Sequence, residues 1–238
     1  MPAGPPRWLF DAWSTFYDLP IVQRLTYRPV QDAVVRALRD TRPRRVLDVG
    51  CGTGLLAARL RRELDGAVLV GCDFSHGMLV RARGHDAVVS WVQGDAQRLP
   101  FRDASADAIV STEAFHWFPD QRRALAEFLR VLVPGGRLLV ALVNPTDAVR
   151  AVARLGSRAI GQPADWPTRD EMRALFAEAG FEVESQQRLY RIPAGLLLPP
   201  VLTVGRRPDG VDRRSSRNAP LGEAPSAPGN GTSPPGCA

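Results

Sequence analysis

Three closely spaced glycines stand where an apolar run ends. The stretch "VLDVGCGTGLLA", residues 46–57, places Gly50, Gly52 and Gly54 behind a short run of aliphatic residues. Glycine adopts backbone conformations closed to other residues and lets a ligand approach backbone N–H groups closely. The glycines alone leave two interpretations open. One is a tight turn between a strand and a helix, and the other is a loop that touches a ligand.

Three acidic residues make the second interpretation more specific. Asp48 precedes Gly50, Asp73 closes the run "AVLVGCD", and Asp95 follows "VSWVQG". The dinucleotide fingerprint would require a third glycine where Leu55 stands. A carboxylate beside the first glycine suits an ammonium or sulfonium group better than a pyrophosphate. Asp73 could accept both ribose hydroxyls, and Asp95 could accept from the amine of adenine. One such acid would be an ordinary loop or capping residue, but three at successive strand ends favour a binding site.

The elements that position these residues alternate between strands and helices. Strands are expected over residues 44–50, 67–73, 89–95, 106–115, 136–144, 181–192 and 197–205. Helices are expected over residues 56–66, 75–83, 120–136 and 168–180. Ser75 is the expected N-cap of the second helix, and Thr168 with Glu171 forms a capping box. This order predicts an α/β fold with a doubly wound, mostly parallel, seven-stranded Rossmann-like sheet and a ligand crevice at the carboxyl ends of the strands.

The composition predicts one folded domain between two different ends. Residues 1–40 are expected to form a helical cap or lid, with an aromatic-rich start and a helix after Pro29. Residues 41–205 are the expected binding domain. Residues 206–238 are rich in Pro, Gly, Ser and Arg, and they are expected to form a disordered tail because they offer too little apolar surface to offset their ordering entropy.

Charge and cysteine usage narrow the function classes. The net charge is +6, all 31 basic residues are arginine, and residues 46–205 carry 18 residues of each sign. A neutral central domain argues against a nucleic-acid substrate. The three cysteines show no metal-ligand or disulfide spacing, so no metal is expected. No apolar run approaches the length of a membrane-spanning helix, and the N-terminus lacks signal-peptide features, which predicts a soluble, cytoplasmic protein.

Several segments together resemble the class I S-adenosylmethionine-dependent methyltransferases. "VLDVGCGTG" is similar to their first motif, "VGCDFSHGML" to the acidic end of strand two, and "VQGDAQRLPF" to the adenine loop. "DAIVSTEAFHWFPD" with "ALAEFLRVLVPGGRLLV" resembles their stretch from strand four to strand five. The resemblance covers roughly residues 40–185 and is strongest to the small-molecule branch that includes ubiquinone and menaquinone biosynthesis C-methyltransferases.

The resemblance implies S-adenosyl-L-methionine as cofactor and a set of residues that hold it. Gly50 to Gly54 would approach the methionyl part, Asp73 the ribose, Asp95 and Ala96 the adenine edge, and Met78 the adenine ring, with Thr112 beside the methionine moiety. The full implied set is Asp48, Gly50, Cys51, Gly52, Gly54, Asp73, Phe74, Met78, Gly94, Asp95, Ala96 and Thr112.

The activated methyl group needs alignment more than it needs a base. His116 in "AFHWF" is the candidate general base, and the alternative is that it only forms pocket wall. Glu113 is a weaker candidate, while His76 and His85 are expected at the surface.

The aromatic N-terminus and "FHWF" favour a small apolar or aromatic acceptor that is methylated on carbon or oxygen. The segment after strand four reads "STEAFHW" and lacks the [DN]-P-P-[YFW] turn of amino-group-modifying nucleic-acid enzymes. Two alternatives remain: a nucleic-acid-modifying methyltransferase, and a cofactor-binding protein without turnover.

Overall fold

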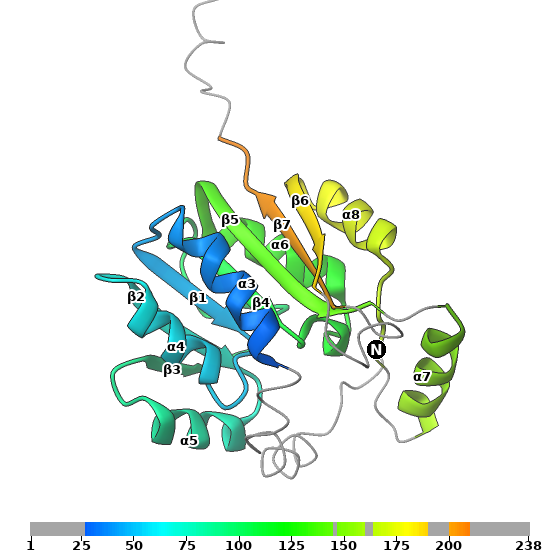
Figure 1. Ribbon diagram of the computed structural model, residues 1–238, viewed down its shortest axis with the longest axis horizontal. Helices are drawn as coiled ribbons and strands as arrows, with labels where there is room; N and C mark the ends of the chain where they lie inside the picture. The colour runs from blue at the N-terminus through cyan, green and yellow to red at the C-terminus, as the bar shows by residue number, and fades with distance from the viewer. Residues whose placement is uncertain (1–26, 145–146, 160–163, 190–199, 210–238) are drawn as a thin grey trace, which may run out of the picture.

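A seven-stranded sheet organises the molecule. The computed structural model describes residues 27–144, 147–159, 164–189 and 200–209, and its strands follow the order β3-β2-β1-β4-β5-β7-β6 (Figure 1). The strands are β1 (Arg45–Val49), β2 (Val68–Asp73), β3 (Ser90–Gln93), β4 (Ala106–Thr112), β5 (Leu132–Val143), β6 (Glu182–Arg188) and β7 (Pro200–Arg206). Parallel pairing joins β3, β2, β1, β4 and β5, and β7 pairs antiparallel with both β5 and β6. The predicted doubly wound, mostly parallel sheet is confirmed.

Helices cover both faces of the sheet (Figure 1). They are α3 (Arg28–Arg39), α4 (Leu55–Glu63), α5 (His76–His85), α6 (Gln121–Val131), α7 (Asp147–Ala159) and α8 (Arg169–Glu178), with a short 3-10 turn η2 (Phe115–Trp117) after β4. One core cluster joins α3 and α4 to the sheet, and the other joins α6 and α8 to its opposite face. The carboxyl ends of β1, β2, β3 and β4 therefore lie at one edge of the sheet. This arrangement brings together the strand ends that carry Asp48, Asp73 and Asp95.

Local capping agrees with the sequence. The Ser75 hydroxyl accepts a hydrogen bond from the Met78 N–H at 3.2 Å, which starts α5. Thr168 and Glu171 form the reciprocal capping box at the start of α8. Each arrangement satisfies backbone N–H groups that have no partner inside the helix.

The structure differs from the sequence prediction in several places. The helix expected over residues 120–136, with Pro134 and the two glycines closing it, ends at Val131. Strand β5 begins at Leu132, so "LVPGG" belongs to the strand. Helix α7 lies in a region where no helix was expected. Strand β7 includes Arg206, and Arg207 donates a hydrogen bond to the Leu129 carbonyl at 2.9 Å.

Helix α3 packs against the sheet through Val30, Val34 and Leu38, each at most 1% exposed. The rest of the expected cap, residues 1–26, lies outside the described residues, as do residues 210–238 of the expected tail.

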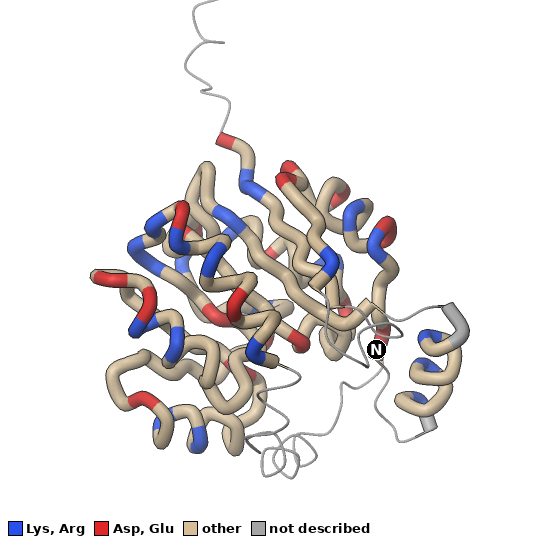
Figure 2. The backbone as a smooth tube through the Cα atoms, viewed as in Figure 1, with Lys and Arg blue, Asp and Glu red and all other residues tan. Residues whose placement is uncertain are grey.

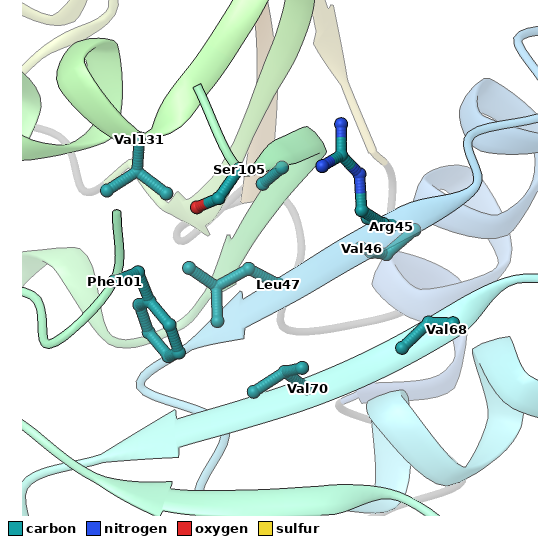
Figure 3. Close-up of a pocket in the computed structure, with 9 residues that line it drawn as sticks. Arg45, Val46, Leu47, Val68, Val70, Phe101, Ser105 and Val131 are labelled. Carbon is teal, nitrogen blue, oxygen red and sulfur yellow. The ribbon is translucent and has the colours of Figure 1, made fainter. Parts of the chain in front are cut away.

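The segment that connects β3 to β4 contains no helix, and a small apolar cavity of about 130 Å³ lies between this segment and strands β1 and β2. Leu47, Val70 and Phe101 point into the same space, beside the amino-terminal halves of β1 and β2 (Figure 3). The cavity is thus remote from the carboxyl ends of the strands, where the candidate site lies.

Close packing at Gly71 offers a test of this core. A Cβ added at Gly71 would lie 2.3 Å from the Trp91 ring, whereas one added at Gly84 in α5 meets nothing within 4 Å. We expect Gly71→Ala to lower the free energy of unfolding by about 1–3 kcal/mol, as overpacking does. Gly84→Ala, the matched control, should raise it by roughly 0.5–1 kcal/mol through helix propensity. Urea unfolding measures both, and equal effects would show that Trp91 does not fill this space.

Candidate functional site

The glycine loop after β1 is shaped by packing at two of its glycines and is open at the third. Gly50, Gly52 and Gly54 have φ of 71°, 54° and 78°, in the region that favours glycine. A Cβ at Gly50 would lie 2.4 Å from the Ala114 Cβ, and one at Gly54 would lie 2.3 Å from Trp91. A Cβ at Gly52 would meet nothing within 4 Å. Neighbouring side chains therefore account for two of the three glycines, and Gly52 faces open space that a ligand could occupy.

The Asp73 carboxylate joins this loop to the end of β2. Its Oδ2 accepts a hydrogen bond from the Gly52 N–H, and its Oδ1 accepts one from the Ser75 N–H, both at 2.8 Å. Each carboxylate oxygen can accept more than one hydrogen bond. Asp73 can thus fix the loop and still accept hydroxyl donors from a ligand.

The Asp48 carboxyl lies buried beneath the loop. Asp48 is 1% exposed, and neither of its oxygens has a hydrogen-bond partner among the described residues. Burial, and secondarily the nearby charge of Asp73, raises the pKa of Asp48 to about 8. Asp48 is therefore mostly protonated at pH 7. A positive charge that approaches such a carboxyl lowers its pKa, because attraction between the two charges offsets the cost of ionising a buried group.

The other predicted residues after β2 and β3 lie at the same carboxyl ends of the strands. Asp95 Oδ1 accepts from the Gln97 N–H at 2.9 Å, and the Gly94 N–H donates to the Asp73 carbonyl at 3.0 Å. These bonds bring the loop after β3 beside the end of β2. Ala96 and Met78 are buried, and Phe74 is 42% exposed.

The Cys51 and Cys72 thiols are also buried here. Burial, with smaller contributions from Asp48 and Asp73, raises the pKa of the Cys51 thiol well above its usual range, and burial raises that of Cys72 to about 12. Both thiols are neutral at physiological pH, and neither is an activated nucleophile.

Beyond β4, the backbone turns sharply at Glu113, which has a φ of 54°. The Glu113 N–H donates to the Ala141 carbonyl at 2.7 Å, and its Oε2 accepts from the Val143 N–H at 3.2 Å. This carboxylate is thus tied to β5 rather than free to act as a base. Thr112 ends β4 just before the turn. Ala114, directly after the turn, lies against Gly50 of the glycine loop.

His116 lies in an aromatic cluster directly after that turn. Its ring stacks on Trp166 with centroids 5.0 Å apart and contacts Trp117 at 4.9 Å. His116 is 7% exposed, its Nδ1 has no hydrogen-bond partner among the described residues, and burial lowers its pKa to about 3. The imidazole is therefore neutral at physiological pH. By contrast, His76 and His85 are exposed, as predicted.

Backbone contacts attach this aromatic cluster to the segment before α8. The Asp165 N–H donates to the His116 carbonyl at 2.9 Å, and the Gln121 side chain bonds the Phe115 and Asp165 carbonyls at 3.3 and 2.8 Å. Arg154 of α7 in turn bonds Asp165 Oδ1 through its Nε at 2.8 Å. Two segments more than forty residues apart thus build one aromatic wall after β4.

Sequence reasoning missed three residues that shape the site: Ala114, Trp91 and Trp166. Ala114 and Trp91 occupy the space that side chains at Gly50 and Gly54 would need, and Trp166 stacks on His116. No spacing signal in the chain links Trp166 to His116. The sequence likewise carries no signal that Ala114 packs against Gly50.

Comparison with known proteins agrees with this geometry. Residues 47–140 match the methyltransferase domain family model. The chain is 32% identical over 191 residues to the demethylmenaquinone methyltransferase of Thermus thermophilus, covering 70% of this chain and 84% of that protein. It is 39% identical to the enzyme of the same name from Beutenbergia cavernae, covering 73% and 81%.

Two other relatives show the range of the similarity. The malonyl-[acyl-carrier protein] O-methyltransferase of Hahella chejuensis is 38% identical over 132 residues, and the chain spans only 46% of its length. A solved SAM-dependent methyltransferase from Thermotoga maritima superposes with a TM-score of 0.69 at 25% identity, covering 85% of this chain and all of that one.

The fold and these matches define a class I methyltransferase. The chain belongs to the S-adenosylmethionine-dependent methyltransferases, and its cofactor is S-adenosyl-L-methionine. The residues present fit that molecule: open space faces Gly52, the Asp73 oxygens retain acceptor capacity, and the unpartnered Asp48 carboxyl favours a nearby cation. No group of three potential metal ligands occurs within the described ranges.

The buried Asp48 carboxyl predicts how stability depends on pH without a ligand. The pKa of Asp48 is raised in the folded state, so between about pH 4 and 8 the unfolded chain binds fewer protons and stability falls as pH rises. Asp48→Asn removes this dependence. We expect the variant to gain stability relative to the native protein from pH 5 to pH 8, by roughly 2–5 kcal/mol. The free energy of unfolding of both proteins is measured in urea as a function of pH. If the two curves run parallel, Asp48 is not a buried carboxyl without a partner.

Proposed function

We propose that the protein transfers the methyl group of S-adenosyl-L-methionine to a carbon or oxygen of a small, planar, apolar molecule of the hydroquinone or phenol type. The observation that carries this proposal is the aromatic wall of His116, Trp117 and Trp166. Its first two residues stand between Ala114 and Phe118, which both lie within 4 Å of the place that a Cβ at Gly50 would take. Aromatic side chains favour flat apolar ligands through offset stacking and apolar burial.

In this proposal each predicted residue contacts a different part of the cofactor. Gly52 and its neighbours border the methionyl part, Asp73 accepts the ribose hydroxyls, and Asp95 and Ala96 border the adenine edge. When bound, the cofactor supplies a methyl group already activated by its sulfonium. The task of the chain is then to exclude water and hold the acceptor in line with the methyl group.

The structure favours a positioning role for His116 over the predicted general base. A base works best with a pKa near the operating pH, and burial lowers the pKa of His116 to about 3. A neutral ring stacked on Trp166 can still contact an aromatic acceptor and accept or donate one hydrogen bond.

The relatives support a small-molecule acceptor. Two relatives of which the chain covers 84% and 81% carry the name demethylmenaquinone methyltransferase. A phthiotriol/phenolphthiotriol dimycocerosates methyltransferase of Mycobacterium ulcerans is also 34% identical over 182 residues. These names describe apolar acceptors, several of them with an aromatic ring.

Charge gives the nucleic-acid alternative little support. Positive and negative positions are interspersed over most of the helices seen in Figure 2, whereas α7 shows only positive ones there. Many arginines of the described residues form ion pairs, as Arg61 does with Asp86 and Arg150 with Glu171. Nucleic-acid binding would instead need a sustained positive surface and would weaken steeply with salt.

Methyl transfer to defined acceptors tests the function. The purified protein is incubated with cofactor labelled in its methyl group and with a demethylated isoprenoid hydroquinone, a simple alkylphenol, an acyl-thioester carboxylate or duplex DNA. We expect label in the hydroquinone or the phenol. Label only in the carboxylate or the DNA would overturn the proposed acceptor, and no cofactor binding at all would overturn the function.

The role of His116 is tested with the acceptor that the first experiment identifies. Because burial lowers its pKa to about 3, we expect no loss of kcat from His116 titration between pH 8 and pH 5. His116→Gln should raise KM for the acceptor several-fold and change kcat by less than tenfold. A base would lose about 10²-fold or more in kcat. A hundredfold loss of kcat with unchanged KM would restore the general-base assignment.

A further inference from the structure

The glycine loop has a second anchor besides Asp73, and it comes from the opposite end of α5. The Nδ1 atom of His85, the last residue of α5, lies 2.8 Å from the carbonyl oxygen of Thr53. Thr53 is 2% exposed, whereas His85 is an exposed residue. A carbonyl oxygen only accepts, so Nδ1 carries the hydrogen and donates it. The contact therefore also fixes the tautomer of the neutral ring.

This hydrogen bond completes the hold on one peptide group of the loop. The N–H between Thr53 and Gly54 donates to the Cys51 carbonyl at 2.9 Å, and the carbonyl of the same group accepts from His85. Glycine places little steric restraint on its backbone, so hydrogen bonds determine how such a group is oriented. The bond to Cys51 lies within the loop, whereas His85 ties the group to a separate helix.

The end of α5 that carries His85 is itself held in place. The Asp86 carboxylate accepts from the Nε of Arg61 in α4 at 2.6 Å. The Asp86 carbonyl accepts from the indole N–H of Trp91 in β3 at 2.9 Å, and the ring of Trp91 fills the space beside Gly54. The imidazole is thus presented to the loop from a junction of α4, α5 and β3.

A role at the helix end alone does not explain where the ring points. A basic residue in the last turn of a helix interacts favourably with the helix dipole, and α5 has both Arg83 and His85 there. The N–H of the C-cap residue, Asp86, already donates to the Ala82 carbonyl at 3.1 Å. The His85 ring instead bonds a carbonyl outside its own helix, 32 residues earlier in the chain.

We propose that His85 is a positioning residue for cofactor binding. Its Nδ1–H holds the Thr53 carbonyl and keeps the glycine loop in the conformation that receives the methionyl part. The Asp73 carboxylate holds the same loop at the Gly52 N–H. The inference rests on the proposed placement of the methionyl part at this loop. Because the cofactor and its product share the amino-acid end of that part, His85 supports the binding of both.

Calorimetry with S-adenosylhomocysteine and the full chain tests this role. His85→Ala removes the donor, and we expect the dissociation constant to rise about three- to tenfold, as for the loss of one hydrogen bond. In His85→Asn the amide nitrogen takes nearly the place of imidazole Nδ1, so the affinity should return to within about twofold of the native value. In His85→Gln the amide reaches the place of Nε2 instead, and the affinity should stay as low as in the alanine variant.

Two controls separate positioning from general stability. Arg83→Ala removes the other basic residue from the last turn of α5, and we expect it to leave the affinity unchanged. The free energy of unfolding of each variant, measured in urea, shows whether the affinity follows the Nδ1 donor or the stability of the fold. With a methyl acceptor identified, His85→Ala should raise KM for the cofactor and leave kcat nearly unchanged.

The tautomer of His85 provides a spectroscopic readout. A long-range ¹H–¹⁵N spectrum of the full chain, recorded where the ring is neutral, shows which ring nitrogen carries the hydrogen. We expect the hydrogen on Nδ1, which is the minor form of free histidine. A hydrogen on Nε2 would contradict the bond to Thr53 and with it the proposal.

The remaining outcomes separate this role from the cofactor site. Unchanged affinity in His85→Ala, a loss that asparagine does not restore, or an equal loss in Arg83→Ala overturns the role of His85 and leaves the site intact. Failure of the native protein to bind the ligand overturns the site itself. If His85→Ala does not fold, the asparagine and glutamine variants decide, and equal affinities in those two would overturn the role.

Discussion

The hydrogen bonds of the Asp73 carboxylate hold the binding edge together. One oxygen takes the N–H of Gly52 and the other that of Ser75, so a single side chain fixes the loop after β1 and the start of α5. Ala114 and Trp91 fill the space that side chains at Gly50 and Gly54 would need, so packing against both glycines also shapes the loop. The shape of the site therefore depends on contacts from β2, β3 and the turn after β4, and no single motif specifies it.

The same edge concentrates groups that reduce stability. Asp48 and His116 are buried with polar atoms that lack partners among the described residues, and both have strongly shifted pKa values for that reason. Elsewhere many of the described arginines and acids are paired, and apolar side chains fill both cores. Buried polar groups without hydrogen-bond partners that gather at one edge of an otherwise well-packed fold are typical of a functional site. A bound ligand can supply the partners that the folded chain does not.

Much of this could be read from the sequence because local signals and the fold agree. Each strand of the parallel sheet was an apolar run, and the capping residues Ser75 and Thr168 marked helix starts that the structure contains. The acids after successive strands converge because parallel strands end at one edge.

The misses have physical causes. Leu132 and Val133 extend the apolar pattern of the helix up to Pro134, yet pairing with β4 and β7 draws Leu132 onward into β5. The stacking of Trp166 on His116 depends on contacts between distant segments, which periodicity does not encode. The depth of Asp48 and His116, and hence their charge states, also follows from packing and not from residue type.

The central claim is that the edge formed by residues 48–54, 73–78 and 94–96 binds the cofactor. A crystal structure of the protein with S-adenosylhomocysteine tests it most directly. We expect ribose hydroxyls on the Asp73 carboxylate, the methionyl part over Gly52, and the adenine between Met78 and the loop at Asp95. Density for the ligand elsewhere, for example in the apolar cavity lined by Leu47 and Phe101, or ribose hydroxyls without contact to Asp73, would contradict it.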